Sequence, residues 1–476
     1  MFPFDLGDDS PTSRRRGHSS LGGRPDCGAI LVAMVARIVV AGTHSGVGKT
    51  TVATGLMAAF RARGVAVASC KVGPDFIDPG YHALATGRPP RNLDAWISGA
   101  DAIAPLAVRA AAGADLLVIE GVMGLFDGAV DNTPSSTADV ARLIDAPVVL
   151  VVDGSAMSAS VAALVRGYRD HDSTVDVAGV ILNRVASDRH RQLLTEALAT
   201  IGMPVWGCLA ADDAFEWRDR HLGLVPVGEQ LDDVVSRIDR LGQAVTASCD
   251  LDAIAHAARS ARQLVADRLP APVKVADVRI AVAGGPAFTF IYRDNLDALA
   301  GAGADLVAFD PLHDEHLPDN VDGLVIGGGF PEVFAGRLAD NERLLAEVRS
   351  AVRSGLPTWA ECGGLLWLSD SLDTRPLAGA IAATGTMTDR LTLGYRHATA
   401  LRPNPVIPVG TTVRGHEFHY STLEPAGEAL ALSSRFGERT DGHATPTLLA
   451  TYLHQHLGAD AAPAERFVRA CARSRR

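Results

Sequence analysis

The sequence predicts an α/β protein with two domains. From residue 36 onward, short apolar runs rich in β-forming residues alternate with helical stretches, a pattern typical of a parallel sheet covered on both faces. The alternation weakens after about residue 226 and restarts near residue 278. The chain of 476 residues is also longer than one ordinary domain. We therefore expect two α/β domains joined by a linker.

The composition narrows the class of protein. A hydrophobic content of 47% is that of a globular chain with a sizeable core. The net charge of −11 argues against nucleic acid or an anionic membrane as a general partner, and no apolar run is long enough to span a bilayer. Six cysteines are widely spaced without a CxxC pair, which favours a reducing cytoplasm over disulfides or structural zinc.

The N-terminal segment is polar and rich in Gly, Ser and Arg. Three arginines ahead of an apolar run are a feature of export signals, but this run continues directly into the first strand, which cleavage would destroy. We expect residues 1–33 to be a disordered tail, with Met34 as an alternative start. The first domain is then placed at 34–245, the linker at 246–275 and the second domain at 276–476.

The elements of both domains follow from the apolar runs. In the first domain the predicted strands are RIVVAG, VAVASCKVG, DLLVIEG, PVVLVVD, VDVAGVILNR and PVWGCLA, with helices at KTTVATGLMAAFRARG and SASVAALVRGYRD. LDDVVSRIDRLGQAV and LDAIAHAARSARQLVAD are predicted to be helical. The second domain offers strands at VRIAVAGG, DLVAFDP, DGLVIGGG and LPTWAEC, and helices at YRDNLDALAGAGA and from Pro331 to Ser354. Shorter strands with many turns are expected from about Ala378 to His456.

The stretch AGTHSGVGKTT predicts a phosphate-binding loop, although its first glycine is out of register. A Walker A motif requires glycine at position 43, where this chain has Thr43. Backbone N–H groups at the following helix N-terminus would attract phosphate oxygens, and a glycine turn without ligand is the weaker reading. Lys49 would reach the terminal phosphates. The predicted nucleotide-binding residues of the loop are Gly42, Thr43, Gly46, Val47, Gly48, Lys49, Thr50 and Thr51.

Acidic residues follow two other strands of the first domain. Asp75 and Asp78 lie in KVGPDFIDPGYH, and Glu120 ends the strand in LLVIEG, where ligands of open α/β sheets gather. An acid that faces a phosphate loop is a natural Mg²⁺ ligand, so we expect Thr50, Asp75 and Glu120 to hold Mg²⁺ beside ATP. A capping role is at least as good an explanation for two further acids, Asp127 and Asp131.

The stretch PTWAECGGLLWL places Cys362 between a strand and a helix. This is the shape of a nucleophile elbow, although Ala360 replaces the first glycine of that motif. A helix N-terminus favours the thiolate. The alternative is a buried structural cysteine, but the following Gly363 and Gly364 favour a nucleophile.

A nucleophilic cysteine needs a base and an oxyanion hole. His454 and His456 follow a predicted strand in LLATYLHQHLG. The strand in DGLVIGGGFPE ends in three glycines whose N–H groups suit an oxyanion. The predicted oxyanion-hole donors are Gly328, Gly329 and Gly363.

This second set resembles the class I, triad-type glutamine amidotransferases, which have a flavodoxin-like fold. The resemblance implies that Cys362 attacks the amide of L-glutamine and that His454 is the base. In that family the base belongs to a His-x-Glu motif, and here His456 stands in the place of the glutamate. The third member of the triad is therefore unidentified, and a dyad is the alternative.

The first domain resembles the dethiobiotin synthetase superfamily, in which the leading glycine of the loop lies one residue earlier, as Gly42 does. More specifically, GTHSGVGKTT, KVGPDFIDPGYH, IEGVMGLFDG, GVILNRV and HLGLVP together resemble the cobyrinic acid a,c-diamide synthase family. That resemblance implies amidation of the a- and c-carboxylates of cobyrinate or hydrogenobyrinate with ATP and glutamine. It also implies that Asn183 recognises adenine and that Lys71, Asp75 and Asp78 handle the substrate.

This resemblance extends into the second domain through three stretches, GPAFTFIYRDNL, IGGGFPE and GHEFHYS. They leave His416 and His419 equally open as structural or domain-interface residues. A homodimer is an assembly that the sequence permits.

Three other readings compete with amidation of cobyrinate. The chemistry could be kept with another substrate, as in nickel-sirohydrochlorin a,c-diamide synthase or cobyric acid synthase. A dethiobiotin-synthetase-like carboxylase with a degenerate second domain would not use Cys362 as a glutaminase. A ParA-like nucleotide switch would have no use for Cys362 or His454.

Overall fold

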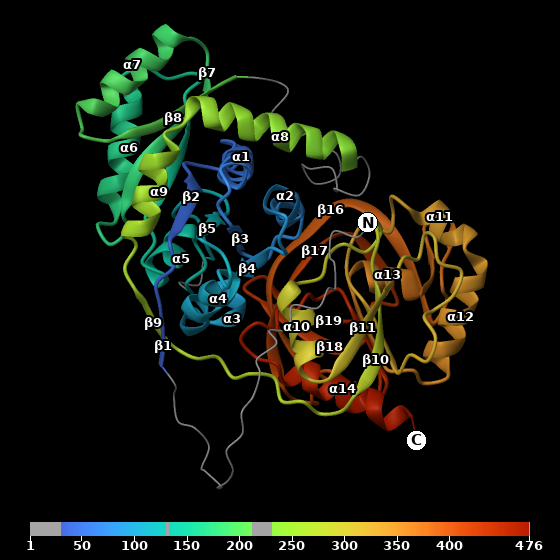
Figure 1. Cartoon of the computed structure of the whole chain (residues 1–476). Helices are drawn as coiled ribbons and strands as arrows, with labels where there is room; N and C mark the ends of the chain where they lie inside the picture. Colours follow the sequence, from blue (N-terminus) through green and yellow to red (C-terminus); the bar gives the residue numbers. More distant parts are fainter. Residues whose placement is uncertain (1–29, 130–132, 212–230, 476) are drawn as a thin grey trace, which may run out of the picture.

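The computed structural model describes residues 30–129, 133–211 and 231–475 (Figure 1). Within these residues the first half forms a parallel sheet, as the sequence predicts. Its strands, in spatial order, are β4 (Arg91–Leu93), β3 (Val67–Val72), β5 (Leu116–Glu120), β2 (Arg37–Gly42), β6 (Val148–Asp153), β7 (Val177–Val185) and β8 (Val205–Ala210). The chain order reverses beside β2, so the loop after β2 lies at a switch point where ligands of such sheets bind.

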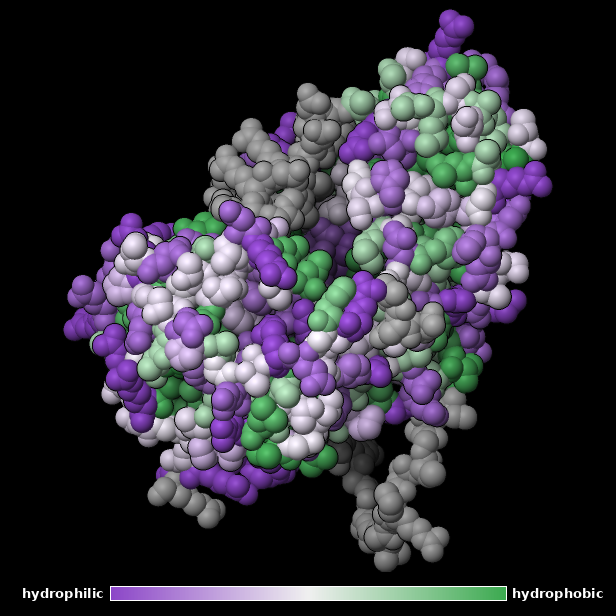
Figure 2. Space-filling view, turned by 180° about the vertical axis from the view of Figure 1, so that it is seen from behind, coloured by the Kyte–Doolittle hydropathy of each residue, from purple (hydrophilic) through white to green (hydrophobic). Residues whose placement is uncertain are grey.

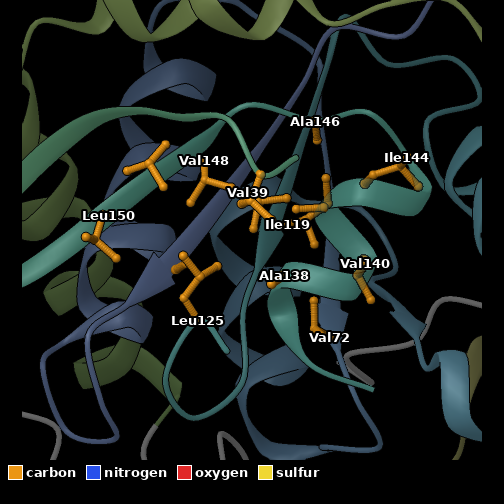
Figure 3. Packing of buried hydrophobic residues seen from close by; sticks show 14 of the residues in the cluster. Val39, Val72, Ile119, Leu125, Ala138, Val140, Ile144, Ala146, Val148 and Leu150 are labelled. Atoms are coloured by element: carbon orange, nitrogen blue, oxygen red, sulfur yellow. The ribbon is translucent and has the colours of Figure 1, made fainter. Parts of the chain in front are cut away.

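Alternating side chains of the strands build two cores, one on each face. In β2, Ile38 and Val40 point to one face, while Val39 and Ala41 point to the other. The first face packs on α1 (Lys49–Ala62), α2 (Ile77–Thr86), α8 (Leu231–Ser248) and α9 (Leu251–Ser260). The second face packs on α4 (Ile103–Ala110), α5 (Thr137–Leu143), α6 (Ser160–His171) and α7 (Asp188–Ala199). Figure 3 shows part of this second core, where Val39, Ile119 and Val148 meet Val140.

The tail and the linker differ from their predicted bounds. Residues Ile30–Ala33, assigned to the tail, form β1 and pair antiparallel with β9 (Leu264–Asp267). The expected linker 246–275 contains α9 and β9, because α9 buries Leu251 and Ile254 against the first domain. Only the stretch between β9 and the next strand, β10 (Val278–Ala283), connects the two halves without a helix or strand.

The second half contains another mainly parallel sheet. Its spatial order is β11 (Ala304–Phe309), β10 (Val278–Ala283), β12 (Gly323–Ile326), β13 (Thr358–Glu361), β21 (Leu448–Thr451) and the antiparallel β20 (His443–Thr445). One face packs on α10 (Arg293–Gly301) and α14 (Ala462–Ser474), and the other on α11 (Ala335–Asp340), α12 (Glu342–Arg353) and α13 (Gly363–Leu368). The single helix expected from Pro331 to Ser354 is thus two helices, because Asn341 ends α11 and caps α12 through Leu344 N–H.

The stretch expected to hold short strands forms a long antiparallel ribbon instead. β16 (Ile381–Ala400) has 20 residues and β17 (Thr412–Glu424) has 13. They pair with each other, and β16 also joins β14 (Ser369–Leu372) and β18 (Leu430–Ser434), which continue to β15 (Arg375–Pro376) and β19 (Gly437–Asp441). The turn-forming residues lie inside a strand rather than at its end. The pairing of β16 with β17 shifts register between Met387 and Thr392, and Gly394 adopts a left-handed φ.

The two halves contact each other through α3 (Ala95–Ser98), which packs on β17, and through the loops around it. η1 (Ala100–Ala102) follows α3 and leads into α4. The surface is hollowed where the halves meet, with hydrophilic residues in the hollow (Figure 2). Within the described residues, every helix is too short or too polar to cross a membrane.

Candidate active sites

The loop between β2 and α1 has the backbone of a phosphate-binding loop. Gly46 and Gly48 adopt φ values of 80° and 94°, which glycine takes without strain. The displaced first glycine has a steric reason: a Cβ on Gly42 would lie 2.6 Å from Cγ2 of Val47 and 2.9 Å from Cγ of Lys49. The loop folds back over the end of β2, and only glycine leaves it room.

Two polar side chains donate hydrogen bonds to backbone carbonyls of this loop. The Lys49 ammonium donates to the His44 carbonyl at 3.1 Å. Burial, and then the nearby Lys71, lower the pKa of Lys49 to about 8. Asn183 at the end of β7 donates its amide N–H to the Val47 carbonyl at 2.9 Å. This contact gives Asn183 a structural part in the loop, and its role in adenine recognition stays a prediction.

Two other predicted residues of the loop are buried, Thr43 and Thr51. The Thr43 carbonyl accepts from the hydroxyl of Tyr168 on α6. This contact ties the loop to α6.

Glu120 is the centre of a buried polar cluster beside the loop. Its Oε1 accepts from the Thr50 hydroxyl at 2.7 Å and from the Lys71 ammonium at 2.8 Å. Lys71 and Glu120 are paired residues of the neighbouring strands β3 and β5, which explains their proximity. Burial alone would raise the pKa of Glu120, but Lys71 and His82 outweigh it and hold that pKa well below its ordinary range.

The Lys71 ammonium joins the predicted acids into one cluster. Besides Glu120 it contacts Oδ2 of Asp78 at 2.6 Å and Oδ2 of Asp75 at 4.0 Å. Burial would lower the pKa of Lys71, but these carboxylates raise it, so the ammonium stays charged. Burial, followed by Asp75 and Glu120, raises the pKa of Asp78. Three carboxyl groups thus surround the Lys71 ammonium.

His82 belongs to this cluster and had no role assigned from the sequence. Its Nε2 lies 2.6 Å from Oε2 of Glu120, and both side chains are fully buried. Its Nδ1 has no hydrogen-bond partner among the described residues. The available signal was the spacing, because Asp78 and His82 are four residues apart on α2 and therefore share one face.

The predicted metal ligands are brought together only in part. Thr50 and Glu120 touch, whereas Asp75 contacts Lys71 and accepts from Ile77 N–H at 2.7 Å at the start of α2. Among the described residues, no three His, Cys, Asp or Glu side chains converge on a metal position. Asp127 accepts from Gly124 N–H within a turn, and Asp131 lies outside the described residues.

In the second half, Cys362 lies at the predicted elbow. It follows β13, begins α13 and adopts φ 48°, a left-handed value unusual for a residue with a side chain. Gly364 lets α13 approach β12, since a Cβ there would lie 2.6 Å from the Ile326 carbonyl. Ala360 lies within regular β13, so glycine is not required at that position.

The surroundings of Cys362 favour its neutral thiol over the thiolate. Its Sγ lies 3.8 Å from the Phe418 carbonyl. Burial, and then the Glu332 carboxylate, raise the pKa of Cys362. Both effects oppose the thiolate that the start of α13 is expected to favour.

His454 follows β21, the strand next to β13, and its side chain is 1% exposed. The edge of its imidazole lies against Gly328, where a Cβ would be 2.5 Å from Cε1. On the other side, Nδ1 faces Oε2 of Glu361 at 3.4 Å. Glu361, the residue before Cys362, thus faces Nδ1, the ring nitrogen that the carboxylate of a catalytic triad would contact.

A pocket of about 410 Å³ opens at Cys362. Gly329 and Gly363, two predicted oxyanion-hole residues, line it together with Glu332. The third predicted donor needs correction, because Gly328 N–H is bonded to the Phe290 carbonyl at 3.0 Å. Its N–H is occupied by this bridge between the two loops.

The remaining histidines have separate places. His456 lies in the domain interface, with Nε2 3.5 Å from Asp294 and Nδ1 3.1 Å from the Ser98 hydroxyl. His416 is buried and exchanges backbone hydrogen bonds with His454. His419 stacks on Tyr452 with 3.7 Å between ring centroids and lines the Cys362 pocket.

A phosphate-binding domain with a lysine–carboxylate cluster, fused to a domain with a cysteine elbow and a glycine-lined pocket, defines the class of ATP-dependent amidotransferases. The family comparisons agree with that class. Residues 38–225 match the CobQ/CobB/MinD/ParA nucleotide-binding domain. Residues 279–462 match the CobB/CobQ-like glutamine amidotransferase domain.

Full-length relatives give the particular family. The chain is 48% identical over 474 residues to hydrogenobyrinate a,c-diamide synthase of Streptomyces coelicolor, covering 92% of this chain and 98% of the relative. It is 45% identical to the enzyme of the same name from Thermobifida fusca, covering 94% and 99%. It is 42% identical to cobyrinate a,c-diamide synthase of a Synechococcus strain, covering 91% and 98%. The chain belongs to the hydrogenobyrinate and cobyrinate a,c-diamide synthase family.

Proposed function

We propose that the protein amidates the a- and c-side-chain carboxylates of cobyrinate or hydrogenobyrinate in cobalamin biosynthesis, using ATP and L-glutamine. The observation that supports this most strongly is the presence in one chain of the Lys49–Glu120 phosphate site and the Cys362 pocket. The names of the full-length relatives support the choice of substrate.

The ATP site serves to activate the carboxylate. A carboxylate is a poor acyl donor because oxide is a poor leaving group. Transfer of the γ-phosphoryl group gives an acyl phosphate and ADP, and ammonia then displaces phosphate to form the amide. Lys49 would stabilise charge on the phosphoryl group as it moves, and Asn183 would contact the adenine base as the family resemblance implies.

Thr50 and Glu120 would hold Mg²⁺ beside the phosphates, since hydroxyl and carboxylate oxygens are its preferred ligands. The three carboxyl groups around Lys71 fit a bound cation. When bound, Mg²⁺ would neutralise phosphate charge during the transfer. Lys71, Asp75 and Asp78 would position the corrin side chain next to the ATP site.

The second site serves to release ammonia. His454 would take the proton of Cys362 as the sulfur attacks the glutamine amide carbon, and would return it to the departing ammonia. The N–H groups of Gly329 and Gly363 would stabilise the oxyanion. Water then hydrolyses the thioester to glutamate. Glu361 would orient His454 through Nδ1. His456, which stands in the place of the family's glutamate, would not have this role.

The proposal is tested by incubating the protein with ATP, Mg²⁺ and glutamine carrying an isotopically labelled amide nitrogen. Four substrates are supplied in separate reactions: cobyrinate, hydrogenobyrinate, a,c-diamidated corrin and nickel-sirohydrochlorin. The masses of the products are measured by mass spectrometry. We expect two labelled amides on cobyrinate or hydrogenobyrinate. Label on nickel-sirohydrochlorin alone, or on the already diamidated corrin alone, would assign the protein to one of the competing synthases.

We further propose a cytoplasmic location and assembly as a homodimer. The five described cysteines are free, as expected in a reducing compartment. Light scattering of the purified protein measures the mass in solution, and fractionation of cells locates the protein.

A further inference from the structure

The segment between β3 and α2 connects the two sites. Asn92 holds it from the first domain, donating to the carbonyls of Gly73 at 2.9 Å and Asp75 at 2.8 Å. Tyr292 holds it from the second domain, donating its hydroxyl to the Pro74 carbonyl at 3.0 Å. The segment is therefore fixed on both sides of the domain interface.

Phe76 projects from this segment into the second domain. Its ring stacks on Tyr292 at 4.3 Å and on Phe290 at 5.2 Å between centroids. It also lies 4.9 Å from the imidazole of His454, tilted by 50°. An aromatic side chain of the ATP-binding domain thus forms one wall around the glutaminase base.

The surroundings of His454 make this wall important. Backbone bonds to His416 fix the main chain of His454 but not its ring. The Nδ1 atom is buried without a hydrogen bond in the described structure, and its nearest acid, Glu361, is 3.4 Å away. With Glu361 3.4 Å away, no short hydrogen bond fixes the ring at Nδ1, so its orientation also depends on packing, and two of the groups that pack on it are Gly328 and Phe76.

We infer that Phe76 is a positioning residue for His454, supplied by the ATP-binding domain. The glutaminase site is then complete only when the two domains are docked. The inference rests on the proposed role of His454 as base. Phe76 also lies between Asp75 and Asp78 in the chain, so the acids that contact Lys71 and the wall of the glutaminase site belong to one short segment.

The test compares Phe76→Ala with wild type in two assays, glutamine hydrolysis and amidation of the corrin from added ammonia. A misplaced base lowers turnover, whereas Phe76 itself does not line the pocket at Cys362. We expect kcat for glutamine hydrolysis to fall by about 10²-fold, KM for glutamine to stay within about twofold, and ammonia-supported amidation to be unchanged. Phe76→Tyr, which keeps the ring, should restore most of the turnover.

The matched control is Trp96→Ala, which removes another aromatic side chain from the domain interface. Trp96 stacks on Tyr395 at 4.5 Å, contacts the ring of His397 and lies under Arg414 at 5.2 Å. Its glutaminase kcat should fall much less than that of Phe76→Ala, because the Trp96 ring packs on Tyr395 and not on His454.

Three results would overturn the inference: an unchanged kcat in Phe76→Ala, an equal loss of kcat in Trp96→Ala, or an equal loss of ammonia-supported amidation. If kcat is unchanged and the nitrogen released from glutamine no longer reaches the corrin, Phe76 is part of the ammonia route instead. Failure of wild type to amidate any corrin from ammonia would contradict the proposed function but leave the hydrolysis comparison informative.

Discussion

At the scale of single residues, Glu361 is adjacent to both groups of the proposed glutaminase centre, Cys362 and His454. It precedes Cys362 in the chain and faces Nδ1 of His454 across the space between β13 and β21. The backbone N–H of Gln455 donates to its other oxygen at 3.3 Å, which holds the carboxylate in place. A carboxylate fixed in this way can stabilise the imidazolium that forms during attack.

Replacing Glu361 by glutamine tests this role. Glu361→Gln keeps the shape but removes the charge that favours the imidazolium, so we expect kcat for glutamine hydrolysis to fall by about 10²-fold. Ammonia-supported amidation, which does not need the base, should persist. Glu347→Gln is the matched control, because Glu347 faces Nδ1 of His316 at 2.9 Å on the surface. Equal turnover in both variants would remove Glu361 from the catalytic apparatus.

Glu332 offers a second test within the glutamine pocket. It is the sole acid among the described residues that line the pocket, so it suits the α-ammonium of glutamine. We expect Glu332→Gln to raise KM for glutamine by about 10- to 100-fold, the loss of one charged hydrogen bond. A substrate analogue without the α-amino group should show no such change. If both substrates lose affinity equally, Glu332 does not read the ammonium.

The same residue gives a pH dependence. Burial raises the pKa of Glu332 to about 7. The carboxylate is ionised above that pH, so KM for glutamine in wild type should fall as pH rises through about 7. Glu332→Gln should lose this dependence, as initial rates across the pH range would show.

The sequence singles out Cys362, His454 and Lys49 from local patterns as candidates whose roles stay predictions, since Cys362 and His454 follow strands and Lys49 begins the helix after the glycine loop. It could not locate Glu361 as the partner of His454, since 93 positions of chain separate them and the family motif directs attention to His456. The occupied N–H of Gly328 and the buried contact of His82 likewise depend on loops that meet only in the folded chain. Site residues held by one element were predictable, and those defined by contact between elements were not.

At the scale of elements, the phosphate loop shows why its glycine is displaced. We expect Gly42→Ala to push Val47 and Lys49 out of place, because the new Cβ would lie 2.6 Å and 2.9 Å from their side chains. ATP-dependent amidation should drop with a KM for ATP raised at least about tenfold, which corresponds to a loss near 1.4 kcal/mol. Glutamine hydrolysis measures whether the second domain is intact.

The control for that variant is Gly167→Ala in the middle of α6, where a Cβ would meet nothing within 4 Å. It should leave KM for ATP unchanged and stabilise the helix by about 0.5–1 kcal/mol. A wild-type KM for ATP in Gly42→Ala would mean that the loop tolerates a side chain and that steric fit does not explain the shift.

The elements themselves were largely predictable where they repeat a strand–helix rhythm, as β2 and β3 do. They were not predictable where pairing between distant parts of the chain determines the length of a strand. β16 and β17 contain glycines and turn residues that predict short strands, yet their mutual pairing extends both. α9 contains a helix pattern but was assigned to a linker, because only its burial on the first core shows the domain to which it belongs.

At the scale of the whole molecule, a charged network holds the domains together. Asp294 of the second domain contacts Arg91 at 2.6 Å and Arg109 at 3.2 Å from the first, and His456 lies 3.5 Å away. The Asp294 side chain is 1% exposed, so its charge depends on these partners. The network lies near Tyr292, which also contacts the Phe76 segment. Domain docking and the packing on His454 are therefore expected to weaken together.

Asp294→Asn should loosen this docking. Arg91 keeps its contact with Asp297 at 2.5 Å but loses Asp294, and removing one partner of a buried ion pair costs up to about 3–5 kcal/mol. We expect the thermal transition to shift down and to split into two, and glutaminase kcat to fall while ammonia-supported amidation declines less. Asp252→Asn is the control, because its pair with Arg63 lies on the surface, where such pairs contribute little.

The pH dependence of stability gives this last prediction a second readout. Burial alone would raise the pKa of Asp294, but His456 and Arg91 outweigh it and hold that pKa below its ordinary range. A carboxyl whose pKa is depressed on folding stabilises the fold above its unfolded value of about 3.9 and loses that contribution as pH falls toward the folded value. Wild type should therefore lose more stability than Asp294→Asn between about pH 5 and pH 3, as thermal melts across that range would measure. Parallel losses in the two proteins would show that Asp294 carries no net charge interaction across the interface.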